Sequence, residues 1–62
     1  MEITIKANKS YKGDISKAVI INGTHEFNIY RKGDFYENDR FSNTWDTIKE
    51  MKEWINMNKG IL

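Results

Sequence analysis

A chain of 62 residues has room for one domain, because two separate hydrophobic cores cannot be built from so few residues. Its 10 Lys and Arg residues against 9 Asp and Glu residues give a net charge of +1, which excludes the strong basic excess typical of a dedicated nucleic-acid-binding protein. The absence of cysteine excludes disulfides and thiolate metal sites. No signal-peptide pattern or long apolar run is present, which predicts a cytoplasmic protein.

Residues 2–41 have the pattern of short strands separated by turns. Ile3, Ile5 and Ala7 alternate with polar residues, and this period of two predicts a half-buried strand over residues 2–9. Turn-forming residues divide the remainder into further strands. These are expected over residues 15–21, 25–31 and 35–38.

The parity of the apolar residues around each turn predicts the register. A two-residue loop after Ile21 would place Val19 and Phe27 on opposite faces of the sheet, whereas a three-residue loop over residues 22–24 places them on one face. The second arrangement is expected because it collects the apolar side chains. The resulting apolar face comprises Ile3, Ile5, Val19, Ile21, Phe27, Ile29 and Phe35.

Similar three-residue loops at residues 11–13 and 31–33 would complete this face. Gly13 and Gly33 are expected to adopt positive φ in these loops, because a residue without a Cβ tolerates that conformation. Glu37 does not fit the alternation, so the fourth strand is expected to end or bulge just after it. The expected pairs are Ile5 with Val19, Ile3 with Ile21, and Ile29 with Phe35.

The last third of the chain predicts an amphipathic helix over about residues 44–58. Ile48, Met51 and Ile55 recur at helical spacing and form an apolar stripe. Gly60 is expected in the left-handed position that often follows a helix.

Two residues compete to start this helix. Thr47 would cap it together with Glu50 in a capping box, and Asn43 would cap it one turn earlier. The earlier start is preferred, because it brings Trp45 onto the apolar stripe.

Together these elements predict an α+β domain, in which a three- or four-stranded antiparallel meander packs against one C-terminal helix. A single helix covers only one face of a sheet, so the opposite face is left for binding, and aromatic and Arg-rich surfaces are enriched at protein interfaces. The alternative is that its tyrosines serve only cross-strand packing. The residues expected at a binding site there are Tyr30 and Tyr36 as anchors, Ile20 beside them, and Lys6, Lys32 and Arg40 at the rim.

Catalytic and metal chemistry are not indicated. His25 is the only histidine, and no orienting partner is evident for it. Asp34, Glu37 and Asp39 lie around one turn but lack the spacing of a calcium loop. We therefore expect no enzymatic activity, no metal and no cofactor.

Phe41 and residues 47–54 resemble the arm-type DNA-binding domains of phage integrases, whose pattern is Phe-x-Thr-x-x-Glu-Ala-x-x-Trp. The segment between Phe41 and Thr47 is longer than in that pattern, and Met51 stands where the small residue belongs. The resemblance implies three strands with a C-terminal helix, and DNA binding through the exposed face of the sheet. The residues that it would assign to DNA are Lys6, Tyr30, Tyr36 and Arg40.

The composition, rich in Ile, Lys and Asn and without Pro, is typical of an AT-rich genome such as that of a low-GC bacterium or its phage. These features favour a small phage or mobile-element protein that docks onto a larger protein or ribonucleoprotein. Inhibitors of host defence nucleases, such as anti-CRISPR proteins, belong to this class. A DNA-binding module and a subunit that homodimerises through its sheet are the alternatives, and no membrane partner is expected.

Overall fold

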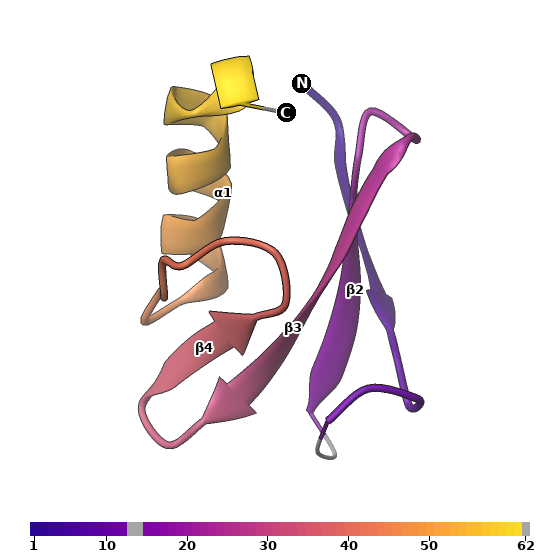
Figure 1. The fold of residues 1–62 in the computed structure, drawn as a ribbon, viewed down its shortest axis with the longest axis vertical. Helices are drawn as coiled ribbons and strands as arrows, with labels where there is room; N and C mark the ends of the chain where they lie inside the picture. Colours follow the sequence, from indigo (N-terminus) through magenta and orange to yellow (C-terminus); the bar gives the residue numbers. More distant parts are fainter. Residues whose placement is uncertain (13–14, 62) are drawn as a thin grey trace.

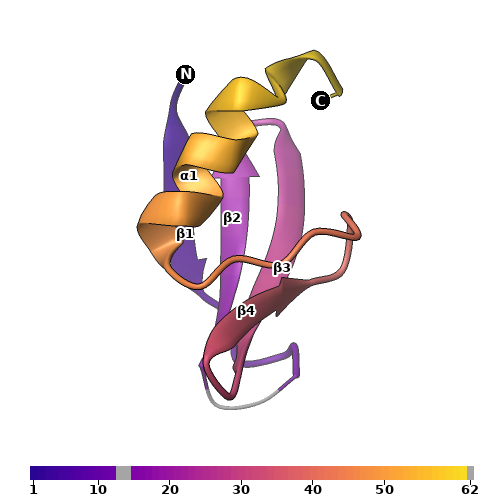
Figure 2. The ribbon, with the colours of Figure 1, turned by 90° about the vertical axis from the view of Figure 1, so that its left-hand side faces the viewer.

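The computed structural model describes residues 1–12 and 15–61. Four antiparallel strands form one sheet in the order β1-β2-β3-β4, and a C-terminal helix packs on one of its faces (Figures 1 and 2). The predicted α+β class is confirmed. The elements are β1 (Ile3–Ala7), β2 (Ser16–Ile21), β3 (His25–Lys32), β4 (Phe35–Asn38), α1 (Ile48–Met57) and a final 3-10 turn, η1 (Lys59–Ile61).

The first three strands have the predicted register. Val19 pairs with Ile5 on one side and with Phe27 on the other. Ile21 pairs with His25, so the β2–β3 loop has the expected three residues, and Asn22 and Gly23 both have positive φ in it, 53° and 73°. Parity therefore identified the face of every residue in these strands.

The prediction for the β3–β4 hairpin is wrong, because the loop is one residue shorter than expected and the pairing is shifted by three residues. Lys32 pairs with Phe35, so the loop contains only two residues, and Ile29 pairs with Asn38 instead of Phe35. Gly33 has the predicted positive φ, 61°, at the first position of this loop, where two-residue type II′ loops require glycine. Gly13, the other glycine with this prediction, lies outside the described residues.

A shift by an odd number of residues exchanges the two faces of a strand. Phe35 therefore lies on the face away from α1, although it was expected in the core. Tyr36 lies on the face toward α1 and packs against the core. Glu37, which violated the predicted alternation, pairs with Tyr30 and needs no bulge.

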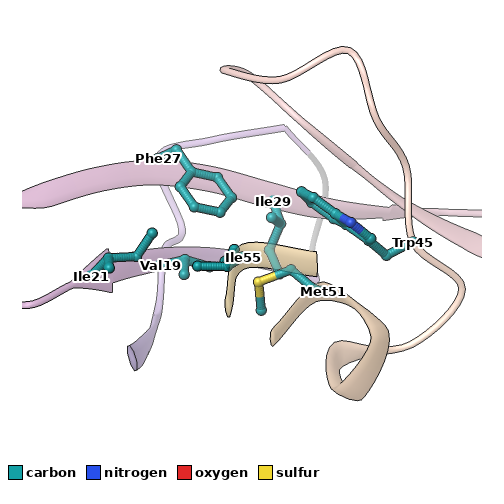
Figure 3. Close-up of a cluster of buried hydrophobic side chains, with 7 residues drawn as sticks. All are labelled: Val19, Ile21, Phe27, Ile29, Trp45, Met51 and Ile55. Atoms are coloured by element: carbon teal, nitrogen blue, oxygen red, sulfur yellow. The ribbon is translucent and has the colours of Figure 1, made fainter. Parts of the chain in front are cut away.

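The core lies between the sheet and α1 (Figure 3). Ile21, Ile29 and Ile55 are fully buried there, and so is Met51 on α1. Half-buried side chains surround these residues, among them Ile3, Ile5, Phe41, Ile48 and Trp54. The buried set is Val19, Ile21, Phe27, Ile29, Trp45, Met51 and Ile55.

The helix begins later than predicted, with Thr47 and not Asn43 as its N-cap. The Thr47 hydroxyl accepts a hydrogen bond from the backbone N–H of Glu50 (3.1 Å), and the Glu50 carboxylate accepts one from the N–H of Asp46 (3.1 Å). This is a capping box whose return bond reaches one residue further back than usual.

Trp45 is buried without belonging to the helix. It forms an isolated antiparallel bridge with Tyr36, in which the Tyr36 N–H donates to the Trp45 carbonyl (2.6 Å) and the Trp45 N–H donates to the Tyr36 carbonyl (3.2 Å). The predicted earlier helix start is therefore wrong, because a backbone bridge to β4, and not a longer helix, brings Trp45 into the core.

The end of the helix also differs from the prediction. Asn58 is the C-cap, and its side-chain amide donates to the Trp54 carbonyl (2.8 Å). The chain then tightens into η1, a common way to satisfy the last carbonyls of a helix. Gly60 lies within η1 and does not have the left-handed φ expected of it.

Candidate functional site

The face of the sheet away from α1, here called the outer face, is the candidate binding surface. Figure 1 shows α1 on one side of the sheet and no helix on the other. Four of the predicted site residues lie on this face by register: Lys6, Ile20, Tyr30 and Lys32. The other residues of the outer face are Thr4, Ser16, Ala18, Glu26, Asn28, Phe35 and Glu37.

Two predicted site residues lie elsewhere. Tyr36 faces the helix, and the Arg31 guanidinium lies 5.0 Å from the centroid of its ring. Arg40 follows β4, and its guanidinium lies 5.4 Å from the ring of Phe41, which packs against the core. The structure therefore does not bring either residue to Tyr30.

Tyr30 is held by a hydrogen bond that crosses from β3 to β4. Its hydroxyl donates to the carboxylate of Glu37, and the Glu37 carboxylate lies 3.9 Å from the Lys32 ammonium. The hydrogen bond to the Glu37 carboxylate, helped by burial and by the charge of Glu37, raises the pKa of Tyr30 to about 12. The phenol is therefore neutral and oriented at physiological pH.

Tyr11 and Lys12, which follow β1, lie against one end of the outer face. The Tyr11 ring packs edge-on against Tyr30 with 5.4 Å between centroids, and the Lys12 ammonium lies 5.4 Å from the centroid of the same ring. The Ser16 hydroxyl donates to the Lys12 carbonyl. Burial, followed by the charges of Asp39 and Glu37, raises the pKa of the Tyr11 phenol.

Asp39 follows β4, and its side chain hydrogen-bonds to Asn28 of β3. Its carboxylate accepts hydrogen bonds from the backbone N–H of Asn28 (2.8 Å) and from the Asn28 side-chain amide (2.9 Å). The Asp39 N–H donates to the Asn28 carbonyl (3.1 Å), and the Asn8 side chain donates to the Asn28 side chain. These contacts give Asp39 a structural role.

Sequence reasoning missed Glu37 and Asp39 as partners of outer-face residues. The alternation of β4 could have identified Glu37, because a two-residue hairpin loop places this residue on the outer face. Nothing local indicated the contact between Asp39 and Asn28, which lie 11 residues apart. In the part of the chain that the structure describes, no group of three His, Cys, Asp or Glu side chains is placed to hold a metal ion.

The outer face combines an apolar centre with mixed charge. Ala18 and Ile20 are half-buried on the central strand β2, and Phe35 is half-buried on β4. Among the described residues, both basic and acidic side chains lie on this face or contact its residues. The basic ones are Lys6, Lys12 and Lys32, and the acidic ones are Glu26, Glu37 and Asp39.

The fold and this surface define a small α+β domain in which one helix covers one face of an antiparallel sheet and leaves the other open. No protein-family model, curated protein sequence or solved structure matches the chain. Among the described residues, no helix is long and apolar enough to cross a membrane.

Proposed function

We propose that this protein is a non-catalytic binding protein that docks onto a larger protein or ribonucleoprotein through its outer face. The observation that supports the proposal is an open sheet face on which Ile20, Phe35 and Tyr30 are only half-buried. Apolar and aromatic side chains with a polar rim are typical of the centre of a protein interface.

The charges of the outer face favour a protein partner over duplex DNA. Phosphate contacts require clustered Lys and Arg side chains, whereas Glu26 and Glu37 lie on the same face as Lys6 and Lys32. Lys32 lies 3.9 Å from the Glu37 carboxylate, which reduces the positive potential there.

The resemblance to integrase arm-type domains supports DNA as the second candidate partner. Of the residues that it assigns to DNA, Lys6 and Tyr30 share the outer face, while Tyr36 and Arg40 do not. Within the protein-binding class, the composition favours an inhibitor of a host defence nuclease.

Affinity capture from a bacterial lysate, with outer-face and helix variants compared side by side, tests the proposal. Ile20→Glu and Phe35→Ala are expected to lose the captured protein, because each removes part of the apolar centre. Met57→Ser on α1 is the matched control, since Met57 is 84% exposed and lies away from the outer face.

Circular dichroism checks that each variant is folded, and labelled duplex DNA tests the second candidate. Binding to DNA that falls steeply with salt would favour the arm-type alternative. Capture that survives both outer-face substitutions but is lost with Met57→Ser would show that the docking surface is the helix.

A further inference from the structure

The two edges of the sheet differ in how they are covered. Beside β4, the isolated bridge of Trp45 to Tyr36 satisfies backbone groups at the edge. Within the described residues, no segment pairs with the free side of β1, the other edge strand. An uncovered edge strand is a template for pairing with another chain.

The hydrogen bonds to β2 identify which groups of β1 are open. The Asn22 N–H donates to the Glu2 carbonyl (2.8 Å), and the Asn8 N–H donates to the Ser16 carbonyl (3.0 Å). Because antiparallel ladders alternate, the even-numbered residues of this segment bond to β2. The N–H and C=O groups of the odd-numbered residues, Ile3, Ile5 and Ala7, therefore point away from β2, outward from the edge of the sheet.

We propose that β1 pairs antiparallel with β1 of a second copy of this chain, about a two-fold axis that passes between the two Thr4 residues. In this register Ile3 lies opposite the partner's Ile5, and Thr4 lies opposite the partner's Thr4. Each Ile3–Ile5 pair exchanges two N–H···O bonds, so the open groups of both isoleucines are satisfied.

Charge complementarity selects this register. It sets Glu2 opposite the partner's Lys6, and Lys6 opposite the partner's Glu2, on the outer face. Both side chains are exposed, and neither forms an ion pair with another described residue. A register centred on Ile5 would instead leave both charges opposite neutral side chains. Opposite charges and Thr–Thr pairs stabilise antiparallel strands, and residues 2–6 supply both from one sequence.

The side of β1 toward the helix also has room for a partner. A cleft of about 350 Å³ lies beside the start of β1, lined by Met1, Ile3, Lys52, Glu53 and Asn56. In the proposed register the partner's Ile5 and the partner's Ala7 lie opposite Ile3 and Met1, at this cleft. Ile3 and Ile5 are only half-buried in the single chain, so the pairing would remove more apolar surface from water.

The assembly would be a continuous sheet with both outer faces on the same side, because the two-fold axis is perpendicular to the sheet. Five-residue strands give a small interface, and small interfaces form weak, concentration-dependent dimers. The dimer does not depend on the function proposed for the outer face, and it can be measured without any other partner.

Reciprocal charge reversal tests the register. Lys6→Glu places two carboxylates opposite each other at both ends of the pairing, and Glu2→Lys places two ammonium groups there. Replacing attraction by repulsion at two pairs is expected to raise the dissociation constant of each variant about tenfold. An equimolar mixture of the two variants is expected to form a heterodimer, because the charges are complementary again.

Sedimentation equilibrium over a micromolar to millimolar concentration series measures the mass against the 7.4 kDa monomer. The double variant Glu2→Lys, Lys6→Glu is expected to dimerise as the unmodified chain does. Lys9→Glu is the control, since it makes the same charge change beyond the paired residues and should leave the dimer intact. Circular dichroism verifies that each variant is folded.

Three results would overturn the proposal. The first is an unmodified chain that stays monomeric at millimolar concentration. The second is a mixture of the single variants that associates no better than each variant alone. The third is a Lys9→Glu variant that loses the dimer as completely as Lys6→Glu does.

Discussion

Tyr30 and Glu37 show how one cross-strand contact sets the chemistry of a surface side chain. A hydrogen bond from a phenol to a carboxylate favours the protonated phenol, so the pKa of Tyr30 rises to about 12 from the ordinary value of 10.0. Because this pKa is raised in the folded state, the contact stabilises the fold fully below pH 10.0. Its contribution is lost as the pH rises through about 12.

Glu37→Gln is therefore expected to lower the pKa of Tyr30 toward its ordinary value, because the hydrogen bond to a carboxylate is its largest cause. The measurement is a titration of tyrosinate absorbance, with Tyr11→Phe and Tyr36→Phe backgrounds to isolate the signal of Tyr30. Asp34→Asn serves as the control, since Asp34 is exposed in the β3–β4 loop. An unchanged titration of Tyr30 in the Glu37→Gln variant would contradict the assigned contact.

At the scale of the element, two caps distinguish the observed helix from the predicted one. Thr47→Ala removes the acceptor of the Glu50 N–H and is expected to lower the free energy of unfolding by about 1 kcal/mol. Asn43→Ala, at the N-cap of the longer predicted helix, is expected to have a smaller effect. Urea denaturation of both variants decides between the two starts, and a larger loss at Asn43 would support the longer helix.

The β3–β4 hairpin loop depends on a residue without a Cβ. Gly33 has φ of +61°, and an L side chain there is strained even though no atom lies within 4 Å of the added Cβ. Gly33→Ala is expected to lower the free energy of unfolding by about 1 kcal/mol. Gly60→Ala is the matched control, because Gly60 has open space and no positive φ. Thermal melts that rank the two variants in the opposite order would exclude this account of the loop.

For the whole molecule, a hydrophobic core joins α1 to the sheet. Ile55 is fully buried between them, and truncating a buried aliphatic side chain costs about 2–5 kcal/mol. A small domain has about 5 kcal/mol in total, so Ile55→Ala is expected to leave the chain largely unfolded. Chemical denaturation followed by circular dichroism measures this, with Met57→Ala, at an 84% exposed position, as control. Equal stability of the two variants would contradict the observed packing of the helix.

The sequence by itself determined the register of β1, β2 and β3 and the apolar stripe of α1. The core side chains of these strands share the face toward α1, as Ile3 with Ile5 and Val19 with Ile21 show. The two alternative registers therefore differ greatly in buried apolar area, and parity alone separates them. Ile20 and Tyr30 were placed on the outer face by the same argument.

Only the tertiary structure decided the faces of β4 and the path that follows it. β4 has four residues with adjacent aromatic side chains, Phe35 and Tyr36, so either register turns one ring toward α1 and the other toward the outer face. The backbone bridge between Tyr36 and Trp45 accompanies the observed register of β4 and brings the Trp45 side chain into the core. This bridge joins residues on either side of an irregular segment that no periodicity describes. For that reason Tyr36 and Arg40 were misplaced, and Glu37 was missed as the partner of Tyr30.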